Sequence, residues 1–263
     1  GWSSETYCQR IYQGHDKKIT KPVVISTWQS IYKLPKSYFR KFDCVIGDEA
    51  HLFKAKSLTS IMTKLHQCKY RYGLTGTLDD TQTHRLVLEG LFGAVKDVVS
   101  TKELIDKKTL ANLRIKCILL KHPSKREKLT YQEELNYLVT NDKRNLFLTN
   151  LLKHLNGNTL CLFQLVEKHG KVLYDKMKER ENVFFIYGKT DTTEREEIRH
   201  IVDGAKNSTI IASYGVFSTG VNIRNINNIV LASPSKSKIR VLQSIGRGLR
   251  TSKHKDSVIV FDI

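Results

Sequence analysis

The stretch from Phe42 to His51 constrains the fold of this chain more than any other. It begins with a mostly apolar run, 42–47, of the length of a strand buried in a parallel sheet. Two carboxylates, Asp48 and Glu49, follow directly. Because ligands of open α/β sheets bind beyond the carboxyl ends of the strands, we expect these acids at that edge. They suit an activated water and a hydrated magnesium ion, which prefers one or two carboxylates together with substrate phosphates.

Short apolar runs alternate with segments of helical spacing along the whole chain. This order predicts parallel strands joined by right-handed crossovers, that is, an α/β fold. The Ser/Thr-x-x-Glu patterns at 100–103 and 193–196 predict capping boxes at the starts of helices. A length of 263 residues suits one large or two ordinary domains. The strands are expected at 22–27, 42–47, 68–74, 114–120, 160–163, 183–187, 208–213, 226–232 and 258–263.

The composition is basic, because 44 Lys and Arg against 26 Asp and Glu give a formal net charge of +18. Such a chain most often meets a polyanion, and nucleic acid is the default partner. A generally basic composition is the alternative explanation. No apolar run approaches the length of a membrane span, so no membrane partner is expected. Five cysteines without CxxC spacing argue against a metal cluster and for a reduced, intracellular protein.

Two further segments accompany the acids. Thr75-Gly76-Thr77 follows the expected strand 68–74, although alone such a tripeptide would more often mark a turn. Near the end of the chain, Arg247 and Arg250 stand three residues apart and so share one face of a helix. Phosphoryl transfer needs fixed positive charge of this kind at the γ-phosphate. A basic surface helix is the alternative for the second segment.

In this order and spacing, the segments resemble the motifs of the superfamily 2 helicases and translocases. Asp48 to His51 matches motif II, 75–77 matches motif III, 213–223 matches motif V and 243–250 matches motif VI. The resemblance implies an α/β fold of two RecA-like parallel-sheet domains, the first incomplete at its N-terminus. It places these domains at 1–115 and 116–263.

The resemblance also assigns roles around a nucleotide, with ATP and Mg²⁺ as the implied cofactors. Asp48 would hold the metal through water, and Glu49 would activate the attacking water. Arg247 and Arg250 would act as arginine fingers on the γ-phosphate. The other nucleotide-facing residues that the motifs imply are His51, Gly220, Asn222 and Gln243.

Hydroxyl residues that follow strands are implied to contact nucleic acid or to couple the two sites. Thr75 and Thr77 would couple ATP hydrolysis to domain closure. The residues implied to contact a phosphate backbone are Ser26, Thr27, Thr190 and Ser213. Helix capping explains the first three of these equally well.

Two features depart from the family pattern. Asn222 stands where the family commonly has Asp. The sequence also contains no Gly-x-x-x-x-Gly-Lys-Ser/Thr, the P-loop that normally cradles the phosphates. We therefore expect either a fragment that starts after the P-loop or a protein that has lost ATPase activity. The other catalytic motifs are intact and favour the fragment.

Three functions remain open at this point. The first is an ATP-driven motor on branched or duplex DNA, with single-stranded DNA as a further candidate, which acts as a monomer in recombination, repair or replication. An RNA helicase of the same superfamily is the second. The third belongs to another class: a non-catalytic clamp that binds nucleic acid through its charge, with an affinity that falls as salt rises.

Overall fold

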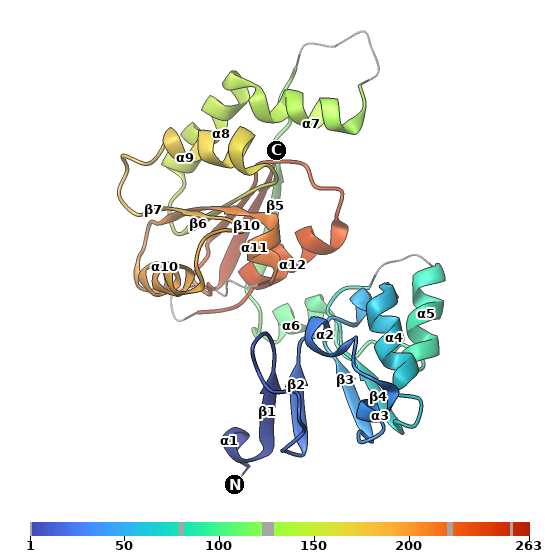
Figure 1. Ribbon diagram of the computed structural model, residues 1–263. Coiled ribbons are helices and arrows are strands. Elements are labelled where there is room, and N and C mark those ends of the chain that lie inside the picture. Colours follow the sequence, from blue (N-terminus) through green and yellow to red (C-terminus); the bar gives the residue numbers. More distant parts are fainter. Residues whose placement is uncertain (1, 79–81, 123–128, 220–222, 253–254) are drawn as a thin grey trace. The chain divides into compact units, whose positions relative to one another are not determined.

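The computed structural model describes residues 2–78, 82–122, 129–219, 223–252 and 255–263 (Figure 1). The chain forms two compact units, Gly1–Lys96 and Asp97–Ile263, called unit 1 and unit 2. The domain boundary predicted between residues 115 and 116 stays a prediction. Among the described residues, no helix is both long and apolar enough to cross a bilayer.

Unit 1 contains two pairs of parallel strands with short helices around them. β1 pairs with β2, and β3 pairs with β4, where Ile46 lies opposite Tyr72. The elements are α1 (Ser4–Tyr7), β1 (Cys8–Ile11), β2 (Val23–Ser26), α2 (Trp28–Ile31), α3 (Lys36–Phe39), β3 (Cys44–Gly47), the 3₁₀ helix η1 (Ala50–Lys54), α4 (Lys56–Lys64), β4 (Tyr70–Gly73) and α5 (Gln82–Phe92).

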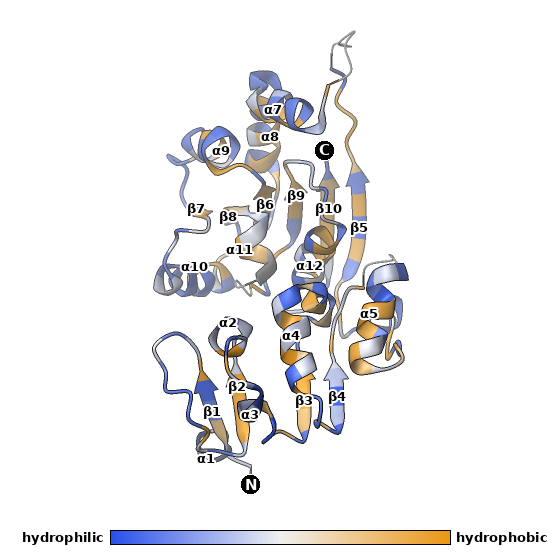
Figure 2. Ribbon diagram, turned by 45° about the vertical axis from the view of Figure 1, so that its right-hand side comes forward, coloured by the Kyte–Doolittle hydropathy of each residue, from blue (hydrophilic) through white to orange (hydrophobic). Residues whose placement is uncertain are grey.

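The β3–β4 pair is buried on one face only. The buried face packs against a cluster that includes Leu58 and Met62 of α4. Gly47 is required there, because a Cβ atom would lie 2.7 Å from Cζ of Phe53. On the opposite face, Ile46 is 63% exposed and Tyr72 is 53% exposed. Strand β3 is apolar along its length (orange in Figure 2), and half of its residues are nevertheless exposed to solvent.

Unit 2 is built on one parallel sheet of six strands in the order β5-β10-β9-β6-β8-β7. Its elements are α6 (Thr101–Asp106), β5 (Asn112–Cys117), α7 (Tyr131–Thr140), α8 (Asp142–His154), β6 (Thr159–Phe163), the π-helix η2 (Val166–Gly170), α9 (Lys171–Asp175), β7 (Val183–Ile186), α10 (Thr192–Gly204), β8 (Thr209–Ser213), α11 (Tyr214–Thr219), β9 (Asn228–Leu231), α12 (Lys238–Gly248) and β10 (Ser257–Asp262).

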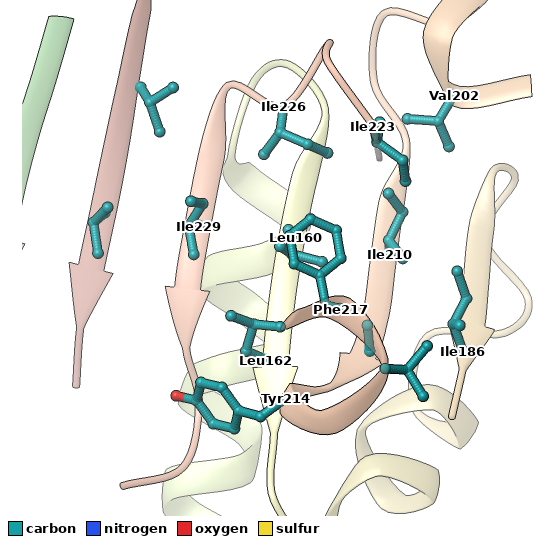
Figure 3. Packing of buried hydrophobic residues seen from close by; sticks show 14 of the residues in the cluster. Leu160, Leu162, Ile186, Val202, Ile210, Tyr214, Phe217, Ile223, Ile226 and Ile229 are labelled. Carbon is teal, nitrogen blue, oxygen red and sulfur yellow. The ribbon is translucent and has the colours of Figure 1, made fainter. Parts of the chain in front are cut away.

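Strand β6 lies inside this sheet and is buried on both faces. Leu160 and Leu162 point into a core that they share with residues of α10 and α11 (Figure 3). Cys161 and Phe163, which alternate with them, pack in a second core with residues of α8 and α9. Because helices cover both faces, the strand is a continuous apolar run instead of an alternating one.

The α/β fold with parallel sheets predicted from the sequence is confirmed, and each expected strand overlaps a strand of the structure. Of the capping box predicted at 100–103, the serine half is confirmed, because Ser100 caps α6 and accepts from the N–H of Glu103 at 3.1 Å. The carboxylate of Glu103 instead accepts from Lys107 at 2.7 Å. The capping box predicted at 193–196 is wrong. Asp191 is the N-cap of α10, and its carboxylate accepts from the N–H of Thr193 at 3.2 Å. Asp191 precedes both threonines and is itself a preferred N-cap residue, so the helix begins directly after it.

Candidate functional site

The acid pair lies directly after β3, at the edge that the sequence predicts. Glu49 has φ 49° and ψ 50°, in the left-handed region that non-glycine residues rarely adopt. Its N–H donates to Oδ1 of Asp48 at 2.9 Å. The N–H of Ala50 donates to the carbonyl of Leu74 at 2.8 Å, which ties this turn to the end of β4. The turn therefore fixes both acids beyond the carboxyl ends of the two strands.

His51 joins the acid turn to the segment after β4. The ring is only 7% exposed, and Nδ1 lies 2.9 Å from Oγ1 of Thr75 and 3.3 Å from Oε2 of Glu49. The hydroxyl of Thr75 donates to the carbonyl of Thr77 at 2.9 Å, so its proton is already engaged. Nδ1 is therefore the donor toward Thr75, with Glu49 as a second acceptor. The structure thus brings Glu49, His51 and Thr75 together, as motifs II and III would require.

The carboxylate of Asp48 fits a magnesium ion held through water. Asp48 is exposed, and its Oδ1 accepts from the N–H of Glu49 at 2.9 Å, which leaves further lone pairs of the carboxylate for the water shell of an ion. Within the described ranges, no group of three or more His, Cys, Asp or Glu could hold a metal ion by itself. This sparse donor set matches magnesium, which keeps its waters and takes few protein ligands.

The hydroxyls predicted after β2 are engaged within the fold. Ser26 donates from Oγ to the carbonyl of Ile11 at 2.8 Å and so links the ends of β1 and β2. Thr27 is the N-cap residue of α2 by position, but its side chain makes no capping hydrogen bond. Its Oγ1 lies 2.9 Å from Oγ of Ser30 instead. Thr27 is exposed at the start of a helix, which leaves it accessible to a ligand.

Thr190 and Ser213 follow strands of unit 2. Thr190 is 8% exposed, and its Oγ1 accepts from the N–H of Tyr187 at 3.0 Å. This bond closes the turn between β7 and α10. The hydroxyl of Thr190 is therefore engaged within the fold. Ser213 is the last residue of β8 and is half-buried at the carboxyl edge of the sheet.

Helix α12 carries the predicted arginine segment. Ser237 caps it and accepts from the N–H of Arg240 at 3.3 Å. Gly248 lets the helix approach the sheet, because a Cβ atom there would lie 2.5 Å from Cδ1 of Ile229. Gln243 and Arg247 are half-buried and one helical turn apart. The prediction that Arg247 and Arg250 share one face of a helix is wrong, because α12 ends at Gly248 and the exposed Arg250 bridges to Leu110 instead.

Two family models match the chain. "Type III restriction enzyme, res subunit" matches residues 2–80, which include the acid turn and Thr75. "Helicase conserved C-terminal domain" matches residues 142–252, which include α12. The ATP-dependent DNA helicase uvsW of Enterobacteria phage T4 is 37% identical over 250 residues, covering 92% of this chain and 50% of that protein. The chain belongs to the superfamily 2 helicases.

Two solved structures and a further curated relative are similar to this superfamily 2 chain. The crystal structure of T4 UvsW matches with a TM-score of 0.50 and 34% identity, covering 99% of this chain and 53% of that one. A fragment of a putative HsdR subunit of a type I restriction enzyme from Vibrio vulnificus matches with a TM-score of 0.73 and 20% identity, covering 97% and 49%. The putative ATP-dependent RNA helicase L396 of Acanthamoeba polyphaga mimivirus is 25% identical over 259 residues, covering 92% and 47%. The chain spans about half the length of the curated relatives it matches.

Lys255 is a functional candidate in this superfamily 2 chain that no sequence signal indicates. It is 5% exposed, and its Nζ donates to the carbonyls of Arg224 and Arg250 at 2.9 Å each and to the carbonyl of Gly248. Burial lowers the pKa of the Lys255 ammonium to about 8. The amine thus fastens the end of α12, next to Arg247, to the loop that precedes β9.

A cluster of buried polar side chains lies after the carboxyl ends of β6 and β9. His169 is fully buried, and its Nδ1 lies 2.9 Å from Oγ of Ser233. Tyr214 donates from its hydroxyl to the carbonyl of Ser233 at 3.0 Å. Burial, assisted by the charge of Arg144, lowers the pKa of His169 to about 3. This ring is held neutral and serves the packing of the sheet edge.

Gly220 and Asn222, which the family motifs place at the nucleotide, lie outside the described residues. The predicted roles of Gln243, Arg247 and Arg250 concern a nucleotide bound by unit 1. They stay predictions, as do the roles of the hydroxyl residues after the strands.

Proposed function

We propose that this chain forms part of an ATP-dependent helicase or translocase that acts on duplex or branched DNA. The network of Glu49, His51 and Thr75 carries the proposal, because it fixes a carboxylate at the carboxyl edge of parallel strands. The uvsW relative is named an ATP-dependent DNA helicase, which favours DNA as the nucleic acid. A role in recombination, repair or replication is part of the same proposal.

The side chains divide the chemistry between them. ATP with its magnesium ion supplies the γ-phosphate and the bond that is cleaved. Asp48 would hold the ion through water, and Glu49 would accept a proton from the attacking water. His51 donates toward Glu49 and so restrains the direction of that carboxylate. Arg247 and Arg250 would stabilise the negative charge that develops on the phosphoryl group.

An RNA substrate is a second candidate. The L396 relative, 25% identical, is named a putative ATP-dependent RNA helicase. Hydrolysis stimulated more by an RNA duplex than by the matching DNA duplex would favour it. A non-catalytic clamp is the third candidate and rests on the net charge of +18.

The first test replaces Glu49 with Gln in a form of the protein that hydrolyses ATP. Glu49→Gln keeps the shape of the side chain and removes its basicity. We expect nucleotide binding to persist while hydrolysis falls by about 10²–10⁴-fold, the usual loss for such a group. Glu103→Gln, which changes a surface carboxylate on α6, is the matched control and should hydrolyse normally. Near-normal turnover in Glu49→Gln would remove Glu49 from the mechanism.

The second test separates the motor from the clamp. Arg247→Lys and Arg250→Lys keep the charge but lose the planar fork of the guanidinium group. An arginine finger can contribute about 10³–10⁵-fold in rate, whereas one lost phosphate contact flattens the salt dependence of binding by about one unit. We expect DNA-stimulated hydrolysis to fall far more than DNA affinity. Full hydrolysis with lost DNA affinity would make α12 a binding helix and refute the motor.

A further inference from the structure

An open pocket lined by lysines lies on unit 1, beside α4. Its volume is about 540 Å³. Among the described residues that line it there is no Asp or Glu, and the side chains between the lysines are Thr and Ser of α4. The lysines come from three elements: Lys36 begins α3, Lys54 ends η1, and Lys56 and Lys64 are the two ends of α4. Their convergence comes from the fold, because Lys36 and Lys64 stand far apart in the sequence.

The amphipathic pattern of α4 creates one wall of the pocket. Leu58, Ile61 and Met62 turn into the core of unit 1. Lys56 is exposed at the start of the helix, and Lys64 is half-buried at its end, at the border of that core. The polar side of α4 therefore forms one wall of the pocket, and Lys36 of α3 and Lys54 of η1 border it.

Lys64 fixes the shape of this pocket. Its Nζ donates to the carbonyls of Tyr32 at 2.5 Å and Leu34 at 2.9 Å. It also lies 5.7 Å from the centre of the Phe39 ring. These contacts fasten α4 to the segment that leads into α3. The pocket is thus a built feature, and Lys64 is part of its frame.

The donors of the pocket are mostly cationic. The hydroxyl of Thr59 donates to the carbonyl of Phe53 at 2.9 Å, and the hydroxyl of Thr63 donates to the carbonyl of Thr59 at 3.0 Å. Both threonine protons are therefore engaged by backbone carbonyls. Lys36 and Lys56 are exposed and, in the part of the chain that the structure describes, form no ion pair. A ligand that carries only acceptors and negative charge, such as phosphate, matches this set.

Several lysines elsewhere in the chain pair with an acid one helical turn away. Such pairs are what a solvated helix surface usually shows. The pairs are Lys107–Glu103, Lys171–Glu167 and Lys178–Asp175, with nitrogen–oxygen distances of 2.7, 2.6 and 3.2 Å. The pocket gathers lysines without a lining acid, which sets it apart from those surfaces.

We propose that this pocket is a binding site for the phosphate backbone of DNA, separate from the hydroxyl residues that the family motifs imply. The inference rests on the proposed function, which supplies DNA as the polyanion. Lysines on flexible stems act as point charges, so the site would add affinity without reading sequence. Duplex DNA presents a charge every ~1.7 Å along its axis, and several lysines in one pocket can contact neighbouring phosphates.

The experiment measures binding of the 263-residue chain to a fluorescent DNA duplex across a salt series. The variant Lys36→Gln/Lys54→Gln/Lys56→Gln removes three charges and leaves Lys64 to hold the frame. We expect the slope of log affinity against log salt to fall by about one unit per lysine. The affinity should fall equally for duplexes of unrelated sequence.

Two control variants isolate the pocket. Lys107→Gln/Lys171→Gln/Lys178→Gln removes the same number of charges from paired lysines of unit 2 and should keep the wild-type slope. Lys36→Arg/Lys54→Arg/Lys56→Arg keeps the charge in the pocket and should also keep the slope, which separates lost contacts from lost folding. Circular dichroism of all three variants checks the fold.

The outcomes distinguish this proposal from the proposed function. If the wild type binds DNA and the pocket variant binds with the same slope, the pocket proposal is overturned and the motor stands. An equal loss in the pocket variant and the unit 2 control also overturns it, because net charge alone would then explain binding. Inorganic phosphate, added at constant ionic strength, should weaken DNA binding of the wild type more than that of the pocket variant, because free phosphate competes for the same lysines. An equal effect on both proteins would show that these lysines hold no phosphate and would also overturn the pocket proposal.

Discussion

The parallel strands of the two units differ in what covers them. In unit 2, β6 lies between β8 and β9, and helices pack on both of its faces. In unit 1, β3 and β4 have a core on one face, while Ile46 and Tyr72 on the other face are more than half exposed. Strands β6 and β3 are both apolar runs of similar length. The comparison teaches that such a run predicts a strand but does not report how many of its faces are covered.

The same difference separates the unit that holds the acid pair from the unit that buries most of the apolar surface. The acids and His51 are held by a strand pair with one buried face, whereas α12 lies on a sheet with two. Parallel sheets are normally covered on both sides, and a large exposed apolar face marks a surface that can be covered. In this chain, the burial energy is therefore concentrated in unit 2.

The largest expected effect is a difference between two isoleucines. Ile229 in β9 is fully buried and Ile46 in β3 is 63% exposed. We expect Ile229→Ala to cost about 2–5 kcal/mol through lost burial and a cavity, and Ile46→Ala to cost less than about 1 kcal/mol. Urea unfolding of the two variants measures both values. Equal costs would show that the exposed face of unit 1 is covered in solution.

The second effect is a loss of stability in acid that arises in unit 2. The pKa of His169 is lowered to about 3 in the fold, against 6.5 in the unfolded chain. The free energy of unfolding therefore keeps its full value above pH 6.5 and decreases as the pH falls toward 3, because the unfolded state then binds a proton at His169 that the folded state excludes. At about 1.4 kcal/mol per pH unit, the loss reaches about 3 kcal/mol by pH 4.

Urea unfolding of wild type and His169→Gln at a series of pH values checks this expectation. The variant keeps a polar group near Ser233 but does not titrate, so its stability should fall less steeply with acid. Parallel pH dependences in the two proteins would assign the acid sensitivity to other groups.

How far the sequence predicts the molecule follows from particular residues. The run 42–47 and the acids after it were placed correctly, because a strand end is a local feature. The pairing of His51 with Thr75 needs the register of β3 and β4, which no local pattern contains. Lys255 has no periodicity to mark it, since its acceptors are backbone carbonyls at the end of α12 and in the loop before β9. The Thr130–Glu133 capping box was within reach of the Ser/Thr-x-x-Glu pattern and was missed.

The third effect concerns that buried lysine. Lys255→Met fills a similar volume and cannot donate, so three carbonyls near the end of α12 lose their donor. We expect a cost of about 1–3 kcal/mol, the usual penalty for buried acceptors left unpaired. Lys206→Met, at an exposed position after α10, is the control and should change stability by less than about 0.5 kcal/mol. Matching values for both variants would show that the contacts of Lys255 add nothing to unit 2.

The smallest effect compares two histidine–hydroxyl pairs of equal length. Nδ1 lies 2.9 Å from the hydroxyl oxygen in both His51–Thr75 and His169–Ser233, but the first pair is only partly buried. In Thr75→Val the ring loses its nearest acceptor and keeps Glu49 at 3.3 Å, so a cost of about 1 kcal/mol is expected. Thr75→Ser retains the hydroxyl and should restore stability. Ser233→Ala should cost more than Thr75→Val, because water cannot replace the lost partner inside unit 2. If Thr75→Val were instead the more damaging change in unfolding experiments, the pair in unit 1 would be shielded from water, and the contrast between the two units would fail at the site itself.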